Sequence, residues 1–244
     1  MINLYSDSLL VSRTANKKFT MARSFNLAFL ILSFTILMLP AFAQQQTDAE
    51  KGSYTKVITE RAEKIVKTLD IADMEKHVRV RDIISGQYRG LSAIHDAADA
   101  KIKAVDEQKE LTKEQKEKLA ADARTEADAQ LGELHKDYLQ KLSAELTPDG
   151  VEKVKDGMTY GVLPITYKGY LDMIPELTTE QKKQIKDWLI EAREHAMDAG
   201  SSEKKHWWFG KYKGRINNYL SAAGYDLKKA GEDWEKRRQA GKTK

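Results

Sequence analysis

The chain has 244 residues, 41 Lys or Arg against 37 Asp or Glu, and no cysteine. The absence of cysteine excludes disulfides and also the lipid-modified cysteine of an anchored envelope protein, so a hydrophobic core must hold the fold. The 201 residues that follow position 43 (244 − 43) are enough for a single domain.

The N-terminal region has the pattern of a secretory signal peptide. Four basic residues precede an apolar run over 27–39, and Ala41-Phe42-Ala43 supplies a small-x-small cleavage pattern. We therefore expect a signal peptide over 1–43, with Met21 as an alternative start that gives a leader of ordinary length, and a periplasmic or secreted product. The rival interpretation is a membrane anchor, but the run is shorter than the roughly 20 residues that a spanning helix needs. No integral membrane segment is expected after cleavage.

Charge is distributed unevenly along the remaining chain. From Ser201 onward there are 12 Lys or Arg against 5 Asp or Glu, a net charge of +7. After removal of 1–43 the net charge is +1, so residues 44–200 carry −6. A basic end on an acidic body indicates either an anionic ligand or intramolecular complementarity.

The first half of the chain shows helical periodicity. Residues 44–53 are polar and aperiodic, which predicts a disordered leader before a single helical domain over 54–240. Apolar residues at helical spacing over 57–69 predict a first helix. Asp73 is positioned to cap a second, longer helix, and Thr112 with Gln115 forms a capping-box pair that opens a third.

The second half contains more helix-start signals and one irregular segment. Leu146-Thr147-Pro148 predicts a helix start, because proline is tolerated in a first turn, and Leu177-Thr178 predicts another. Three glycines and two prolines punctuate residues 157–175, which predicts a bend followed by a short helix. Gly200 is expected to end the helix that starts near 178, in a left-handed conformation.

These patterns together predict the fold class. Alternating strand patterns and hairpin turns between β-branched runs are absent from the sequence. We therefore expect an all-α protein, a single irregular bundle of about six or seven helices with a Gly/Pro-punctuated bend at 157–175.

The sequence contains no recognisable catalytic constellation. It has no cysteine nucleophile, no nucleophile elbow and no phosphate loop, although paired carboxylates are not excluded, so enzymatic activity is left uncertain and no catalytic residue or cofactor is predicted. Glu191, His195 and Asp198 could share one face of a helix, but such clusters are commonly solvated ion pairs, and no metal is predicted.

Aromatic and basic residues and two adjacent asparagines are concentrated in residues 199–225, AGSSEKKHWWFGKYKGRINNYLSAAGY. If 204–223 is helical, the core face is predicted to comprise Trp208, Tyr212, Ile216, Tyr219 and Ala223, with Phe209 and Leu220 beside it. Trp207 then falls on the polar face. Two glycines in the helix interior, Gly210 and Gly214, predict either close backbone packing or a loop.

An exposed tryptophan among amides and cations is suited to binding a sugar ring, whose C–H surface stacks on the indole while polar groups bond the hydroxyls or a uronate. The predicted partner is therefore a carbohydrate, neutral or acidic, and no nucleic acid. The predicted ligand-binding residues are Trp207, Lys211, Lys213, Arg215, Asn217, Asn218, His206, Tyr160 and Tyr167.

Other interpretations remain open. Trp207 could be covered by the N-terminal helices, in which case the basic helix only neutralises an acidic body. The Leu-Thr helix starts also resemble those of small periplasmic chaperones of the Spy type, which favours a chaperone-like helper. A carbohydrate-processing enzyme is the third possibility.

Three long stretches carry a resemblance to a known family. They are KDGMTYGVLPITYKGYLDMIP at 155–175, AREHAMDAGSSEKKH at 192–206 and KYKGRINNYLSAAGYDLKK at 211–229. The chain from about Tyr54 to Trp234 resembles an exported Bacteroidota family catalogued as domain-of-unknown-function family 3826. The resemblance implies sugar binding and an association with polysaccharide utilisation, without an active site to carry over.

Overall fold

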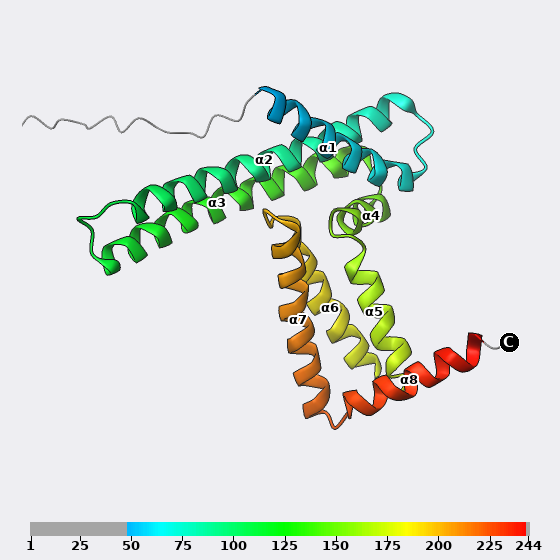
Figure 1. Ribbon diagram of the computed structural model, residues 1–244. Helices are drawn as coiled ribbons and strands as arrows, with labels where there is room; N and C mark the ends of the chain where they lie inside the picture. Colours follow the sequence, from blue (N-terminus) through cyan, green and yellow to red (C-terminus); the bar gives the residue numbers. More distant parts are fainter. Residues whose placement is uncertain (1–47, 243–244) are drawn as a thin grey trace, which may run out of the picture. The chain divides into compact units, whose positions relative to one another are not determined.

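A computed structural model describes residues 48–242 of the chain, and the predicted signal peptide over 1–43 lies outside these residues. Over the described range the backbone forms eight α-helices, one short 3-10 helix and no strand, which confirms the all-α class (Figure 1). The elements are α1 (Asp48–Val66), η1 (Lys67–Leu69), α2 (Met74–Asp106), α3 (Lys113–Glu145), α4 (Pro148–Met158), α5 (Val162–Met173), α6 (Thr179–Met197), α7 (Ser202–Ala222) and α8 (Leu227–Lys242).

Residues 48–242 form eight α-helices, where six or seven were expected. The additional element is α8, which the pattern analysis missed because it has few apolar residues. The Asp226 carboxylate accepts a hydrogen bond from the Lys229 backbone N–H, and Leu227 and Ala230 pack on the neighbouring core. At the other end, α1 begins at Asp48, so it includes part of the segment 44–53 that was expected to be disordered.

The predicted helix starts are found where the capping residues placed them. Asp73 accepts backbone hydrogen bonds at the start of α2, and Thr112 with Gln115 forms a reciprocal capping box on α3. Thr147 caps α4 with proline directly after it, and Thr178 with a glutamine three residues later caps α6. Each cap satisfies backbone donors that the first turn of a helix leaves unpaired.

The bend predicted over 157–175 is confined to a few residues between α4 and α5. Tyr160 and Gly161 have positive φ angles of 60° and 65°. A non-glycine residue rarely adopts this conformation, so Tyr160 is backbone-strained. Gly157 lies inside α4, where an added Cβ would come within 2.9 Å of the Ile65 side chain. That glycine therefore serves close helix packing.

One hydrophobic core joins the N-terminal elements. The helices α2 and α3 lie side by side in Figure 1, and α1 and α4 pack against this pair. Val80, Ile84 and Leu142 are fully buried there, each contributing roughly 1.5–3 kcal/mol to stability. Met197, at the end of α6, belongs to the same core.

A second core joins the C-terminal elements. Its buried residues come from α5, α6 and α7 and from the segment that leads into α6, and α8 packs partly buried residues against it. Ile185, Leu189 and Ile216 are fully buried there. This core fixes the orientation of α7, the helix that carries most of the predicted ligand-binding residues.

Gly200, in the turn between α6 and α7, does not adopt the left-handed conformation that was expected, because α6 already ends at Met197 with Asp198 as its C-cap. An added Cβ at Gly200 would instead come within 2.8 Å of the His95 ring. The glycine is needed for this close approach, which brings the α6–α7 turn against α2.

Candidate functional site

The helix α7 is continuous from Ser202 to Ala222, within the aromatic and basic stretch 199–225. The Ser201 hydroxyl caps its N-terminus by accepting a hydrogen bond from the Lys204 backbone N–H. Gly210 and Gly214 therefore do not mark a loop, and a Cβ added at either would meet no atom within 4 Å. Close backbone packing does not explain these two glycines either.

The core face of α7 is rotated from the one predicted. Its buried residues are Lys205, Phe209, Tyr212, Ile216 and Leu220. Trp208 and Tyr219, expected in the core, are only half-buried, and Ala223 is exposed. The rotation places Phe209 at the centre of the core and moves Trp208 to the edge, so the indole of Trp208 becomes part of the surface.

Trp207 lies on the exposed side of α7, with 59% of its surface accessible to solvent. Its indole meets that of Trp208 edge to face at a centroid distance of 5.0 Å. The Lys211 ammonium lies 5.5 Å from the Trp207 ring centroid and 4.8 Å from that of Trp208. These contacts hold a large apolar ring in place beside a cation without burying it.

Two residues of α6 extend this surface. The His195 ring stacks on Trp208 at 4.3 Å with an interplanar angle of 14°. Further along, the Arg215 guanidinium lies 4.7 Å from the Trp188 ring centroid. We call this surface the Trp207 face; it comprises Trp207, Trp208 and Lys211 with their neighbours Trp188, His195 and Arg215.

Several of the remaining predicted residues lie on the other flank of α7, toward α5. At 100° per residue, His206 and Trp208 lie on opposite sides of Trp207, and Asn217 shares the His206 side. The His206 ring stacks on Tyr160 at 5.5 Å. The Tyr170 hydroxyl donates to the Asn217 side-chain oxygen at 2.7 Å.

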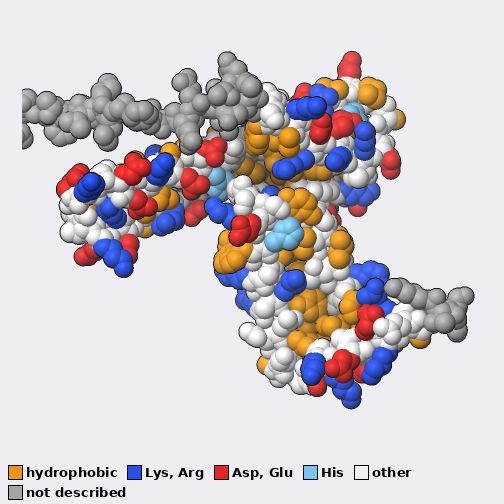
Figure 2. Space-filling view, viewed as in Figure 1, with side chains coloured by type: hydrophobic (Ala, Val, Ile, Leu, Met, Phe, Trp, Pro, Cys, Tyr) orange, Lys and Arg blue, Asp and Glu red, His pale blue; other side chains and the backbone are white. Residues whose placement is uncertain are grey.

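The α5 flank is also less polar than expected. Tyr167 is half-buried against the C-terminal core, and Figure 2 shows hydrophobic side chains gathered between α5 and α7. Lys213 and Asn218 are exposed on α7. The structure thus divides the predicted residues. Trp207, Lys211 and Arg215 belong to the Trp207 face, and Asn218 lies on the same side of α7 as Trp207. On the α5 flank, His206 contacts Tyr160 and Asn217 contacts Tyr170.

The structure adds Trp188, His195 and Trp208 to this face, none of which was among the predicted site residues. Trp188 and His195 are seven residues apart on α6, a spacing that places them on one side of a helix. The sequence showed this spacing, but nothing in it indicated that this side meets α7. Glu191, which lies between them, pairs with Arg215 at 3.8 Å rather than sharing a ligand set with His195 and Asp198. Among the described residues no group of three acidic or histidine side chains is arranged to hold a metal ion.

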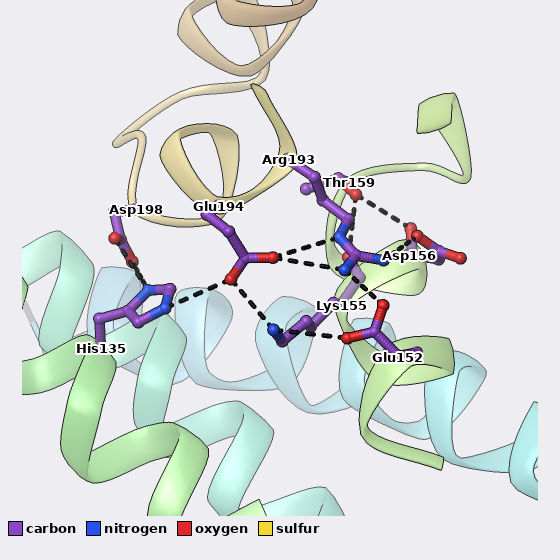
Figure 3. Close-up of polar contacts among 8 residues, drawn as sticks. All are labelled: His135, Glu152, Lys155, Asp156, Thr159, Arg193, Glu194 and Asp198. Atoms are coloured by element: carbon purple, nitrogen blue, oxygen red, sulfur yellow. Dashed lines mark hydrogen bonds and ion pairs between the residues drawn. The ribbon is translucent and has the colours of Figure 1, made fainter. Parts of the chain in front are cut away.

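A second cluster of charged residues joins α3, α4 and α6 (Figure 3). The Arg193 side chain is 2% exposed, and its guanidinium donates to Glu152 at 2.6 Å and to Asp156 at 2.7 Å. Lys155 donates to Glu194 at 3.1 Å, and His135 lies 2.9 Å from Asp198. We call these residues, His135, Glu152, Lys155, Asp156, Arg193, Glu194 and Asp198, the charge network.

The charge network perturbs the protonation of its members. Hydrogen bonding to Asp198 and to Glu194 raises the pKa of His135 to about 9, so this histidine is charged at neutral pH. Burial alone would raise the pKa of Glu194, but the hydrogen bonds from His135 and Lys155 outweigh it and lower the pKa to about 2. Every acid in the network has a basic partner, which indicates that the network links the three helices rather than binding a ligand.

Lys205 is the one cation at a core position of α7. It is 6% exposed, and its ammonium donates to the carbonyl oxygens of Ala196 and Met197 at 3.0 and 3.2 Å. Burial lowers the pKa of Lys205 to about 8. The ammonium donates to the last carbonyls of α6, and so it ties the start of α7 to α6.

No helix within residues 48–242 is long and apolar enough to cross a membrane. A search of curated proteins finds no significant match to the chain. The model of a family described as "Protein of unknown function (DUF3826)" matches residues 55–240, which include all the helices from α2 to α7 and most of α1 and α8. On this match, the chain belongs to the DUF3826 family.

Proposed function

We propose that this protein binds carbohydrate chains without transforming them, and that the Trp207 face is the binding surface. The observation that carries the proposal is the exposure of Trp207 at 59% in a helix whose other large aromatic rings are buried or half-buried. Leaving an indole in water is unfavourable unless a partner covers it, and the C–H face of a pyranose is a suitable partner.

The groups around Trp207 support a polar ligand. Lys211 lies between the two indoles, and Arg215 lies on Trp188 one turn further along. Both cations are exposed and can bond to sugar hydroxyls or to a uronate carboxylate. Acidic glycans are therefore expected to bind more tightly than neutral ones of the same length, with an advantage that falls as salt rises.

The two cavities described in this protein lie elsewhere, one at the α2 and α4 starts and one between α2 and α3. The Trp207 face is an open surface, which suits stacking along an extended chain better than enclosure of a monosaccharide. We expect affinity to increase with oligosaccharide length, because each added ring can contact another aromatic side chain.

Calorimetry with matched neutral and uronate oligosaccharides tests the proposal. Trp207→Ala should weaken binding at least tenfold, whereas Trp234→Ala, which removes a half-buried indole on α8, should not. Absence of binding to any glycan in a broad array, or equal binding by Trp207→Ala, would refute it. Suppression of client aggregation would instead favour a chaperone-like helper, and turnover of a polysaccharide would favour an enzyme.

We also propose that the protein is exported to the periplasm or beyond, on the strength of the sequence pattern over 1–43. Cell fractionation and N-terminal sequencing of the native protein test this. A mature N-terminus at Gln44 is the expected result, and retention of residues 1–43 in a cytoplasmic product would contradict it.

A further inference from the structure

A tyrosine ends helix α4 at a position where glycine is usual. The Gly161 N–H donates to the Asp156 carbonyl at 2.8 Å, and the Tyr160 N–H donates to the Gly157 carbonyl at 3.4 Å. This pair of hydrogen bonds ends a helix on a residue in the left-handed conformation, and Tyr160 is that residue, with a φ of 60°. A Cβ in this conformation crowds the following carbonyl oxygen, so glycine would be less strained. The fold alone therefore gives no reason for a tyrosine at position 160.

Core packing does not explain Tyr160 either. Its ring belongs to neither hydrophobic core, and the residue is 49% exposed. The ring stacks on His206 of α7, which is exposed as well, at a centroid distance of 5.5 Å and an interplanar angle of 20°. Beside the turn, Ile165 is 70% exposed and adds apolar surface. Strained residues of this kind cluster at ligand-binding sites, where the backbone holds a side chain in position for a partner.

The Tyr160–His206 pair presents two free hydrogen-bonding groups. His206 Nδ1 lies 2.8 Å from the Ser202 carbonyl oxygen. A carbonyl oxygen only accepts, so Nδ1 carries the hydrogen, and Nε2 of the neutral ring is an acceptor. Among residues 48–242, no group bonds to Nε2 or to the Tyr160 hydroxyl. An aromatic surface with an acceptor and a hydroxyl beside it suits a pyranose, which stacks through its C–H face and donates through its hydroxyls.

Gly210 keeps the surface between this pair and Trp207 free of side chains. At about 100° per residue, Gly210 lies between His206 and Trp207 in direction, one turn further along α7. A helical side chain leans toward the helix N-terminus, so one at position 210 would cover the gap between those two rings. A Cβ added at Gly210 meets no atom within 4 Å, so packing within the protein does not require glycine there. A ligand that lies against the backbone across this gap does require it.

We propose that the Tyr160–His206 pair is a second sugar subsite, and that a glycan chain bound at Trp207 crosses Gly210 to reach it. A pyranose at this subsite stacks on the exposed aromatic surface and donates a hydroxyl hydrogen to His206 Nε2. A carboxylate has no proton to donate to Nε2, so the subsite favours a neutral sugar, whereas Lys211 at the Trp207 face accommodates a uronate. The inference rests on the proposed function and extends it, because it adds the α4–α5 turn to the binding surface.

Calorimetry with disaccharides and hexasaccharides tests the second subsite. The probes are neutral xylan and mannan oligomers, uronate oligomers of polygalacturonate, and glucuronoxylan oligomers, which carry both kinds of sugar. The unmodified protein is expected to bind at least one hexasaccharide about tenfold more tightly than the matching disaccharide, because only the longer chain contacts both Trp207 and the Tyr160–His206 pair.

Three variants at the subsite separate binding from stability. Tyr160→Gly removes the ring and the backbone strain, so it should weaken hexasaccharide binding about tenfold while the unfolding midpoint changes by no more than about 4 °C. His206→Phe keeps an aromatic ring but removes Nε2, and it should weaken binding about fivefold. Gly210→Leu fills the gap between His206 and Trp207, so binding should fall about tenfold while the midpoint rises, because leucine forms helices better than glycine.

Two controls apply the same chemical changes away from the subsite. Asp70, with a φ of 51°, is the other non-glycine residue of the described chain in the left-handed region, and Asp70→Gly removes strain there. Gly231 lies on α8, which follows the far end of α7 (Figure 1), and a Cβ added there meets no atom within 4 Å. Asp70→Gly and Gly231→Leu should therefore both bind hexasaccharides normally, and neither should lower the unfolding midpoint.

The proposed function and the second subsite fail in different ways. If the unmodified protein binds no hexasaccharide of the panel, both are wrong. If Trp207→Ala loses binding while Tyr160→Gly and Gly210→Leu bind normally, the Trp207 face stands and the second subsite is wrong. A fall in the unfolding midpoint of Tyr160→Gly by more than about 10 °C would give Tyr160 a structural role and would also overturn the inference.

Discussion

The charge network and the Trp207 face are both rich in groups that could bind a ligand, yet they differ in how those groups are satisfied. In the charge network, Arg193 is 2% exposed and donates to carboxylates of α4, and each carboxylate has a basic partner. At the Trp207 face, the indole of Trp207 is 59% exposed and its cationic neighbour is open to solvent.

This difference separates a structural role from a ligand-binding one. Breaking a buried ion pair leaves an uncompensated charge and destabilises the fold, whereas removing an exposed ring costs little folding stability. The network should therefore respond to mutation through stability, and the Trp207 face through binding. Four variants or conditions test this contrast.

The largest effect is expected from Arg193→Met. It leaves Glu152 and Asp156 without their main partner and should lower the free energy of unfolding by about 3 kcal/mol. Urea denaturation followed by circular dichroism measures it. Arg79→Met is the matched control, since it breaks the solvent-exposed pair with Glu145 and should lower the free energy of unfolding far less. An equal loss of unfolding free energy in the two variants would show that the charge network is no more important for stability than an exposed ion pair.

The next effect concerns pH. The pKa of His135 is raised to about 9, above its unfolded value near 6.5, so its stabilising contribution is complete below about pH 6.5 and is lost as pH rises through 9. The loss should be on the order of 2 to 3 kcal/mol. Comparing the pH dependence of unfolding with that of His135→Gln isolates this contribution. If the free energies of unfolding of the two proteins change in parallel between pH 6 and 9.5, His135 does not stabilise the charge network.

A smaller, opposite effect is expected on α7. Gly210→Ala should stabilise the protein by about 1 kcal/mol, because the helix continues through this position and the new methyl group meets no neighbour. The control is Gly157→Ala, where the methyl would come within 2.9 Å of Ile65 and should destabilise. Thermal unfolding measures both. Destabilisation by Gly210→Ala would mean that its side of α7 is covered rather than open.

The smallest change in stability, within about 0.5 kcal/mol, is expected for Trp207→Ala. Phe209→Ala, two residues away but 2% exposed, should lower stability far more. Thermal unfolding of both variants provides the comparison. A large loss of stability in Trp207→Ala would show that this tryptophan has a structural role, and it would remove the main support for glycan binding.

Local signals predicted much of the fold. The starts of α3 and α6 were predictable from Thr112 and Thr178 because a capping box satisfies backbone donors with residues three apart in sequence. The irregular segment over 157–175 was located through its glycines and prolines, although the structure confines the bend to residues 159–161 and continues as α5. Helix α8 was missed, although Asp226 and the spacing of Leu227, Ala230 and Trp234 were available as weak signals.

The candidate site was only partly predictable, because residues that share a helix need not share a surface. Trp207 was assigned to the polar face from helical periodicity, and the structure places it there. The same periodicity misplaced Trp208, since the direction of the core depends on how α5 and α6 pack against α7. The charge network was not predicted, because His135, Asp156 and Arg193 are distant in sequence and meet only in the folded chain.

By itself, the sequence determined the all-α class, the capped starts of α2, α3, α4 and α6, and the place of Trp207 on the polar side of its helix, because each depends on residues within one or two helical turns. Only the tertiary structure decided that Trp207 stays exposed. Tertiary structure decided which flank of α7 each polar residue occupies. It also decided that Gly200 provides room for His95 rather than a left-handed turn, and that the amide nitrogen of Gln87 is buried with no hydrogen-bond partner among residues 48–242. These features depend on contacts between helices, and such contacts are fixed by packing rather than by local propensity.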